Sequence, residues 1–306
     1  MRHRILRVLF LLATSWLCFH VLKQDGYEVP WMPLQEIMRY SVPPPFGHRL
    51  LFAFLANGFQ WVFPGFGYLK CFLLSQLVAI LLAFEAIRRW GALFIRQDLA
   101  FIAQLLLVAI LIPTIGYFNF YDIGIVFFFT ASLLCLYKGR FAAYLILLAL
   151  GTLNHEVSLL LIPVFIAMNA HGNLASRAFW GKVMAQLAVW VGVRSILCWW
   201  LPMEVVPVLH LGDNVRELLH PTAWLLLRYL PSGLWVGVAA FGIRYAPILL
   251  KRSLILLPLL IITALDFGII HEVRLFDALA PLVVALILCL ISGACLQREA
   301  SISSGI

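Results

Sequence analysis

The sequence predicts an all-α, polytopic membrane protein, and its composition and hydropathy pattern are the reasons. Hydrophobic residues make up 63% of the chain and charged residues only 12%, with a mean hydropathy of +0.99, whereas soluble domains are roughly half apolar and about a quarter charged. Apolar runs follow one another, separated by short polar or basic connections. The 306 residues have room for about ten membrane segments of about 20 residues each. We therefore expect one integral membrane domain, residues 1–306, built as a transmembrane helical bundle of about ten segments.

The distribution of charge predicts how this bundle lies in the membrane. The 22 Lys and Arg residues outnumber the 14 Asp and Glu residues, for a net charge of +8. Basic residues gather at the N-terminus and in alternate connections, at 88–96, 138–140, 177–182 and 244–252. Because basic connections stay in the cytoplasm, these belong to the inner face of a bacterial inner membrane, with both termini cytoplasmic. The net positive charge then reflects the membrane topology, and the expected partners are membrane lipids. We expect no nucleic-acid partner.

The six cysteines all fall inside or at the ends of apolar runs, with no CxxC pair and no Cys/His ligand spacing. They are interpreted as small buried hydrophobic residues. We expect no cofactor and no metal centre. Paired His and Glu side chains could hold a divalent cation, but their spacing is not diagnostic of one.

The first 65 residues predict a membrane anchor followed by an outer loop. A basic start, Met1–Arg7, precedes an apolar run to about Leu22 without a small-residue cleavage site, which favours an uncleaved signal anchor. Residues 23–65 are polar and aromatic and are interpreted as the first extracytoplasmic loop. Within it, 32–40 and 49–63 are expected to form helices that lie along the membrane surface. The second of these could instead be a short span.

Later apolar runs alternate between the two faces of the membrane. The expected spans are 68–86, 99–113, 123–137, 187–200, 230–248, 254–270 and 275–295. An aromatic outer turn covers 114–122, and 201–220 forms an outer loop of amphipathic character. Arg194 lies in the outer part of the span at 187–200. Because the spans alternate between the two faces, the polar connections that are not basic all lie on the outer face of the membrane.

One apolar run, Phe141 to Met168, is interrupted in its middle by Asn154-His155-Glu156. A carboxylate at membrane depth costs several kcal/mol, about 3 on the more lenient scales, so Glu156 needs a partner, a water-filled cavity or a function. Basic residues flank the run on both sides, so the chain enters and leaves by the same face. We therefore expect a short, re-entrant-like hairpin with the three polar residues at its apex, facing an outward-open cavity.

Five separated segments deliver polar side chains to this outer face, which is typical of a binding cavity or an active site. The candidates are Asp25, Glu28, His48, Arg49, Tyr121, Asp122, Asn154, His155, Glu156, His271, Glu272 and Arg274. A carboxylate among them could act as a general base, and the arginines could neutralise a departing phosphate.

Each cluster also has a purely structural interpretation. Arg49 and Arg274 could pair with Glu156 or Glu272 and so fix the loops. Asp122 could cap the helix that follows it. The imidazoles of His48 and His155 could be satisfied by neighbouring backbone groups.

Several short motifs resemble a known superfamily. The basic first span, the acidic first outer loop and the many short spans resemble the GT-C superfamily of polyprenyl-phosphate-sugar-dependent glycosyltransferases. The motifs are Pro45-Phe-Gly-His-Arg-Leu-Leu51, Tyr121-Asp122, Gly151-Thr-Leu-Asn-His-Glu-Val157 and Glu272-Val-Arg274. They also look like the polar signatures of little-characterised bacterial multipass proteins.

The resemblance implies a transferase of envelope polysaccharide or lipid-linked sugar metabolism, with a polyprenyl-phosphate-linked sugar as substrate. It implies catalytic carboxylates at Asp25, Glu28 or Glu156, with Asp25 as the base. The remaining candidates would bind substrate. The chain departs from the superfamily because Gly26 and Tyr27 separate the acidic residues of the first loop and no soluble outer domain follows. A transporter or flippase, or a non-catalytic membrane subunit, are the alternatives, although no internal repeat is evident.

Overall fold

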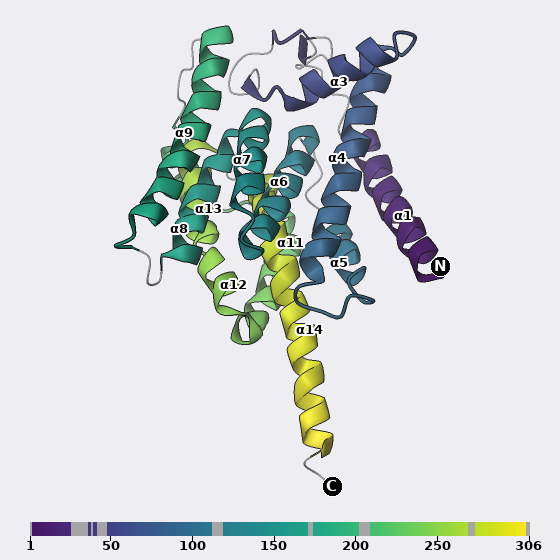
Figure 1. Cartoon of the computed structure of the whole chain (residues 1–306), viewed down its shortest axis with the longest axis vertical. Helices are drawn as coiled ribbons and strands as arrows, with labels where there is room; N and C mark the ends of the chain where they lie inside the picture. Colours follow the sequence, from purple (N-terminus) through teal and green to yellow (C-terminus); the bar gives the residue numbers. More distant parts are fainter. Residues whose placement is uncertain are drawn as a thin grey trace.

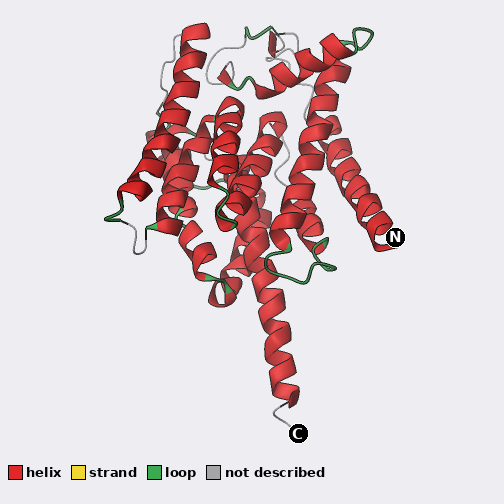
Figure 2. Cartoon of the chain, in the orientation of Figure 1, coloured by secondary structure: helices red, strands yellow, loops and turns green. Residues whose placement is uncertain are grey.

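In the part of the chain that it describes, the computed structural model consists of helices joined by loops, which confirms the all-α prediction (Figure 2). It describes residues 2–25, 36–37, 39–41, 48–111, 119–170, 174–201, 209–268 and 273–303. Within these ranges, the side chains of residues 2–4, 6, 22–25, 119–121, 224–228, 273–275 and 294–303 are not described. No strand occurs in these ranges.

The structure describes α-helices and short 3-10 helices (η) in the following order. They are α1 (Arg2–Asp25), α3 (Leu51–Val62), α4 (Tyr68–Gly91), α5 (Ile102–Leu111), α6 (Asn119–Tyr137), α7 (Phe141–Asn154), η3 (Glu156–Leu160), α8 (Leu161–Asn169), α9 (Arg177–Trp200), α10 (Leu211–Leu219), α11 (Ala223–Gly242), η4 (Ile243–Tyr245), α12 (Ile248–Ser253), α13 (Leu256–Phe267), η5 (Val273–Leu279) and α14 (Ala280–Ser303).

Four helical stretches in the described residues are long and apolar enough to cross a membrane. They are Tyr68–Gly91, Arg177–Trp200, Ile248–Phe267 and Phe276–Gly293. The other apolar helices, among them 102–111, 122–137 and 141–154, have between 10 and 17 residues. A helix of 14 residues is about 21 Å long, shorter than the roughly 30 Å hydrocarbon core. Length and composition thus support a membrane protein, and the figure of about ten membrane segments stays a prediction.

The centre of the bundle is made by α4 and by the first half of α14. α4 packs against α1, α3, α5 and α6. Residues 280–289, the first part of α14, are all buried, as expected for a helix that is apolar on every side. The indole N–H of Trp90 donates to the carbonyl of Pro281 at 2.8 Å, which joins the end of α4 to α14. Gly242 lies directly on the carbonyl of Leu286, so α11 and α14 cross with their backbones in contact.

The expected hairpin is present as α7, η3 and α8. The rings of Phe141 and Phe165 lie 5.6 Å apart, so the start of α7 meets the end of α8 and the two arms run antiparallel. The hydroxyl of Tyr144 lies 2.7 Å from Oε1 of Gln186 and 3.2 Å from the carbonyl of Leu161. This buried polar contact joins both arms to α9. Residues 154–156 therefore stand at the turn.

Basic connections gather at one end of the bundle, here named the basic end. The connection from α4 to α5, the connection from α8 to α9, and α12 all lie toward the end from which α14 projects (Figure 1). The α6–α7 connection joins them, because the Trp90 and Tyr137 rings lie 5.3 Å apart and Lys182 lies over Phe141. The charge pattern that predicts an inner face thus corresponds to one physical end of the molecule.

The opposite end, here named the α3 end, is crossed by α3, which runs transverse to α4 (Figure 1). The helix expected at 49–63 is therefore present, and its direction favours the surface-lying interpretation over the span. α1 continues to Asp25, so the helix covers the first three residues of the predicted loop. The helix expected at 32–40 lies mostly outside the described residues.

Two helices begin earlier than predicted. α9 begins at Arg177 rather than 187, because Oγ of Ser176 accepts the N–H of Phe179 at 3.4 Å and caps the helix. α11 begins at Ala223 rather than 230 and contains Pro231, which membrane helices tolerate when neighbours satisfy the freed carbonyl. The early turns of α9 contain Arg177 and Lys182, which the sequence pattern assigns to a basic connection, whereas the first turns of α11 are apolar up to Arg228.

The outer loop predicted at 201–220 contains the amphipathic helix α10. The side-chain amide of Asn214 donates to the carbonyls of Ala264, Leu265 and Gly268 at the end of α13, at 3.3, 2.8 and 2.8 Å. It therefore satisfies carbonyls that a helix C-terminus leaves open. The apolar side chains of α10 point away from this contact, and Leu211, Val215, Leu218 and Leu219 are exposed.

Candidate functional site

Two of the five predicted polar clusters meet at the hairpin turn. His48 and Arg49 immediately precede α3, and Glu156 begins η3. Nη2 of Arg49 donates to Oε1 of Glu156 at 2.7 Å, and Nε donates to Oε2 at 3.3 Å. The guanidinium is buried, and about a third of the carboxylate side chain is exposed (35%). Of the pairings that the sequence allows, the structure thus forms the one between Arg49 and Glu156.

The ion pair determines the protonation of Glu156, which lies outside the four candidate spans. Burial by itself raises the pKa of a carboxyl group, because it disfavours the charged form. The charge of Arg49 and its hydrogen bond to the carboxylate act in the opposite direction and prevail, so the pKa of Glu156 lies well below its usual range. Glu156 is consequently ionised and forms a neutral pair with Arg49.

The turn itself is made by His155, whose extended backbone (φ −162°, ψ 139°) ends α7. Its Nδ1 accepts the backbone N–H of Val157 at 3.1 Å, which caps η3. A ring nitrogen that accepts this bond carries no proton, so the 3.6 Å contact between Nδ1 and Glu156 is not an ion pair in this state. The interpretation that neighbouring backbone satisfies His155 is confirmed for this nitrogen.

Asn154 is buried against α6. A Cβ on Gly124 would lie 2.5 Å from Oδ1 of Asn154, so the amide fits only because residue 124 has no side chain. This contact brings the turn to the first part of α6, which also holds Asp122. Asp122 is buried in the first turn of α6 and is not the residue before it, because the helix already includes Asn119. The capping interpretation of Asp122 is therefore wrong, and its carboxylate instead lies within the positive end of the helix dipole.

His48 joins the cluster to α9. Its imidazole is 1% exposed, with Nε2 at 3.2 Å from the carbonyl of Leu201 and Nδ1 at 3.5 Å from Nη2 of Arg194. Since a carbonyl only accepts, Nε2 carries the proton and Nδ1 faces the guanidinium as an acceptor. The imidazole of His48 therefore lies between the carbonyl of Leu201 and the guanidinium of Arg194.

Aromatic rings hold α3 and the end of α9 together. Tyr40, Phe54 and Trp200 have ring centroids 5.4 to 5.6 Å apart. The phenol oxygen of Tyr40 also accepts from the amide of Asn57 at 2.8 Å. Such aromatic pairs contribute about 1 kcal/mol each beyond their burial, so this contact fixes the position of His48 relative to Arg194.

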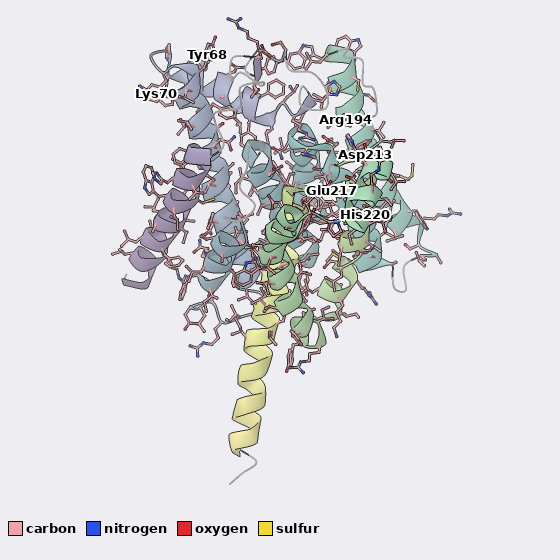
Figure 3. The ribbon with its side chains drawn as sticks, turned by 180° about the vertical axis from the view of Figure 1, so that it is seen from behind. Tyr68, Lys70, Arg194, Asp213, Glu217 and His220 are labelled. Carbon is pink, nitrogen blue, oxygen red and sulfur yellow. The ribbon has the colours of Figure 1, made fainter. Side chains whose placement is uncertain are left out.

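Arg194 is a member of this cluster that sequence reasoning did not assign to it. It lies on the part of α9 toward the α3 end, while Asp213, Glu217 and His220 follow one another along α10 (Figure 3). Tyr68 and Lys70, at the start of α4, lie on the other side of that view. The available signal was an arginine inside an otherwise apolar span, which is a functional candidate by default.

The remaining candidates stay predictions. Asp25 ends α1, and Tyr121 and Arg274 belong to α6 and η5, but their side chains are not described. Glu28, His271 and Glu272 lie outside the described residues. Among the described side chains, no group of three His, Cys, Asp or Glu residues gathers as it would around a metal ion.

Comparisons with protein-family models, with curated proteins and with solved structures found no match to this chain. The chemistry of the cluster therefore has to be argued from its own residues. It contains one ionised carboxylate, two guanidinium groups and two imidazoles, contributed by the segment before α3, the hairpin turn and α9.

Proposed function

We propose that this protein is a membrane-embedded, glycosyltransferase-like enzyme that acts on a lipid-linked sugar at the α3 end of its bundle. The observation that carries the proposal is the Arg49–Glu156 pair beside His48 and Arg194. Charged groups in an apolar bundle are costly and mark functional sites by default. A carboxylate with neighbouring cations is also the chemistry needed to activate a hydroxyl and to stabilise a departing phosphate.

The proposed reaction transfers a glycosyl group from a polyprenyl-phosphate donor. An acceptor hydroxyl attacks the anomeric carbon, the bond from that carbon to the phosphate oxygen breaks, and the phosphate leaves with the electron pair. The hydroxyl proton passes to a carboxylate, for which the superfamily resemblance favours Asp25, with Glu28 as the other candidate. Glu156 is already held by Arg49 and therefore suits orientation of substrate better than proton transfer.

The proposal includes a topology. The basic end would face the cytoplasm and the α3 end the outside of a bacterial inner membrane, with about ten membrane segments and both termini inside. The gathering of basic connections at one end supports this orientation, because such connections resist translocation.

Replacement of Asp25 by asparagine tests the enzyme. If Asp25 is the general base, Asp25→Asn should lower the release of polyprenyl phosphate from polyprenyl-phosphate-linked hexoses by about 100-fold or more. The variant should keep the expression level and melting temperature of the wild type, and Asp98→Asn, at the exposed surface of the basic end, should keep full activity. Full activity of Asp25→Asn would remove this residue from the mechanism.

The broken hairpin favours one second candidate, a transporter or flippase. In many transporters, the translocation path is lined by discontinuous helices that contain an extended residue where the helix breaks. His155 is such an extended residue between α7 and η3. Movement of a lipid-linked sugar across liposomes by purified protein, without formation of a covalent product, would support this candidate against the enzyme.

A further inference from the structure

The two arginines of the cluster carry the same charge but differ in what neutralises it. Arg49 binds both oxygens of Glu156. Arg194 forms no ion pair with any described carboxylate, and its Nη2 lies 3.5 Å from Nδ1 of His48. Among the described side chains, no carboxylate therefore neutralises Arg194 as Glu156 neutralises Arg49.

One nitrogen of Arg194 is buried without an acceptor. Nη1 is shielded from solvent and has no hydrogen-bond partner in the described part of the chain. A buried donor without an acceptor costs about 1–3 kcal/mol, and more when it belongs to a charged group. An anionic oxygen at this nitrogen would remove that cost and would also balance the charge of Arg194.

His48 gives the guanidinium a fixed direction. Its proton is committed to the carbonyl of Leu201, so its other nitrogen accepts from Nη2. The aromatic contact among Tyr40, Phe54 and Trp200 holds His48 against α9. Arg194 therefore presents Nη1 in a set position, as a residue that recognises a phosphate must.

We propose that Arg194 binds a phosphate group of the substrate, with His48 as its positioning residue. This inference deepens the proposed function, on which its link to catalysis rests, and it moves the phosphate-binding role from Arg49 to Arg194. The planar fork of donors on Arg194 matches the oxygens of a phosphate, which is the anionic group of the proposed lipid-linked donor.

The surroundings of Arg194 favour a phosphate carried by a lipid. Val191 and Cys198 lie three residues before and four residues after Arg194, on the same face of α9, and both are exposed. α9 is a candidate membrane span, so this face would meet the lipid. A phosphate at the head of a lipid could approach Arg194 along it, whereas a free phosphate ion would gain nothing from the apolar side chains.

The test is binding to full-length protein in detergent micelles, with three probes: farnesyl phosphate, farnesol and inorganic phosphate. The wild type should bind farnesyl phosphate, and Arg194→Gln should weaken that binding by at least about tenfold, as expected for the loss of a charged hydrogen bond. Arg216→Gln, on the exposed side of α10, is the matched control and should bind as the wild type does. His48→Gln should weaken binding less than Arg194→Gln, because it removes only the positioning group.

Several outcomes would overturn the proposal. If Arg194→Gln binds farnesyl phosphate with wild-type affinity, Arg194 is not part of the site. If the wild type binds farnesol and farnesyl phosphate equally well, the site does not recognise the phosphate group. If Arg194→Gln weakens the binding of inorganic phosphate and of farnesyl phosphate equally, Arg194 binds an anion, but the inference that this anion is carried by a lipid is rejected. If Arg194→Gln does not fold, as judged by a lost melting transition, Arg194→Lys replaces it, because lysine keeps the charge without the planar fork of donors. Wild-type affinity of Arg194→Lys for farnesyl phosphate would contradict recognition by the planar guanidinium.

Failure of the proposed function is distinguishable from failure of this site. Asp25→Asn should bind farnesyl phosphate as the wild type does, because the proposed base does not hold the phosphate. Arg194-dependent binding with no transfer of any hexose would leave the anion site standing and reject the transferase.

Discussion

At the scale of single residues, the environment of a charge determines what it can do. Arg49 is buried at the start of α3 and is neutralised by Glu156. Removing one partner of such a pair leaves the other with an unbalanced charge in an apolar place, which costs more than the pair itself contributes. Arg49 is thus interpreted as a structural clamp on the hairpin turn.

This interpretation predicts the effect of removing the clamp. Arg49→Met should destabilise the protein by about 1–3 kcal/mol, since it leaves the carboxylate of Glu156 without its cation. The matched control is Arg96→Met, which breaks the pair with Asp98, where the arginine and aspartate side chains are 80% and 51% exposed. Exposed pairs contribute about 0–1 kcal/mol, so the control should melt within about a degree of the wild type. Equal melting temperatures for the two variants would contradict a stabilising role for the Arg49–Glu156 pair.

At the scale of elements, the hairpin depends on close approach between helices. α7 ends against α6 at Gly124, and its first turn packs with α8 and α9 through Phe141 and Tyr144. The turn residues are held by contacts with α6, with Arg49 in the segment before α3, and with the backbone of Val157 in η3. A change in any one of these contacts should move the cluster.

Gly124 offers the sharpest test of this packing. Gly124→Ala places a methyl group 2.5 Å from Oδ1 of the buried Asn154, and overpacking of this kind costs about 1–3 kcal/mol. Gly192→Ala, in α9, meets no atom within 4 Å and should be neutral or stabilising by up to about 1 kcal/mol, because alanine favours the helix. Thermal unfolding of both variants in detergent provides the comparison.

The opposite order of melting temperatures would show that Asn154 can move aside, and the hairpin would then be less tightly packed than the structure indicates. A lower affinity of Gly124→Ala for farnesyl phosphate would connect this packing to the anion site.

At the scale of the whole molecule, charge is divided between two ends. The basic end contains the connections that begin or end α4, α6, α8, α9 and α12, while α3 covers the other end (Figure 1). The candidate site lies at the α3 end, and both arms of the hairpin start from the basic end.

Cysteine labelling tests this arrangement in the membrane. In a variant without the six native cysteines, Gly65→Cys, beyond the end of α3, should react with an impermeant maleimide on intact cells. Lys138→Cys and Arg177→Cys, on the two sides of the hairpin, should react only after the cells are permeabilised. Labelling of positions 138 and 177 from opposite sides of the membrane would contradict the hairpin, and labelling of all three from outside would contradict the orientation.

Patterns along the chain predict its class and the place of its turn. Composition and hydropathy indicate an all-α membrane protein, and the basic residues around 141–168 predict that both arms of the hairpin begin at one end. These features are local, because each depends on the residues within one segment. The predicted pairing of Arg49 with Glu156 remained one of several possibilities, because Glu272 was an equally possible partner and Arg274 an equally possible cation.

Tertiary structure decided which side chains meet. Arg49 and Glu156 are 107 residues apart in the chain, and His48 and Arg194 are 146 apart. No local pattern encodes such pairings, because they follow from the packing of α3, η3 and α9 against one another. The sequence by itself determined that charged groups would gather at the end away from the basic connections. Only the folded structure distinguishes the neutralised Arg49 from Arg194, whose charge has no carboxylate partner among the described residues, because neutralisation depends on distances in space.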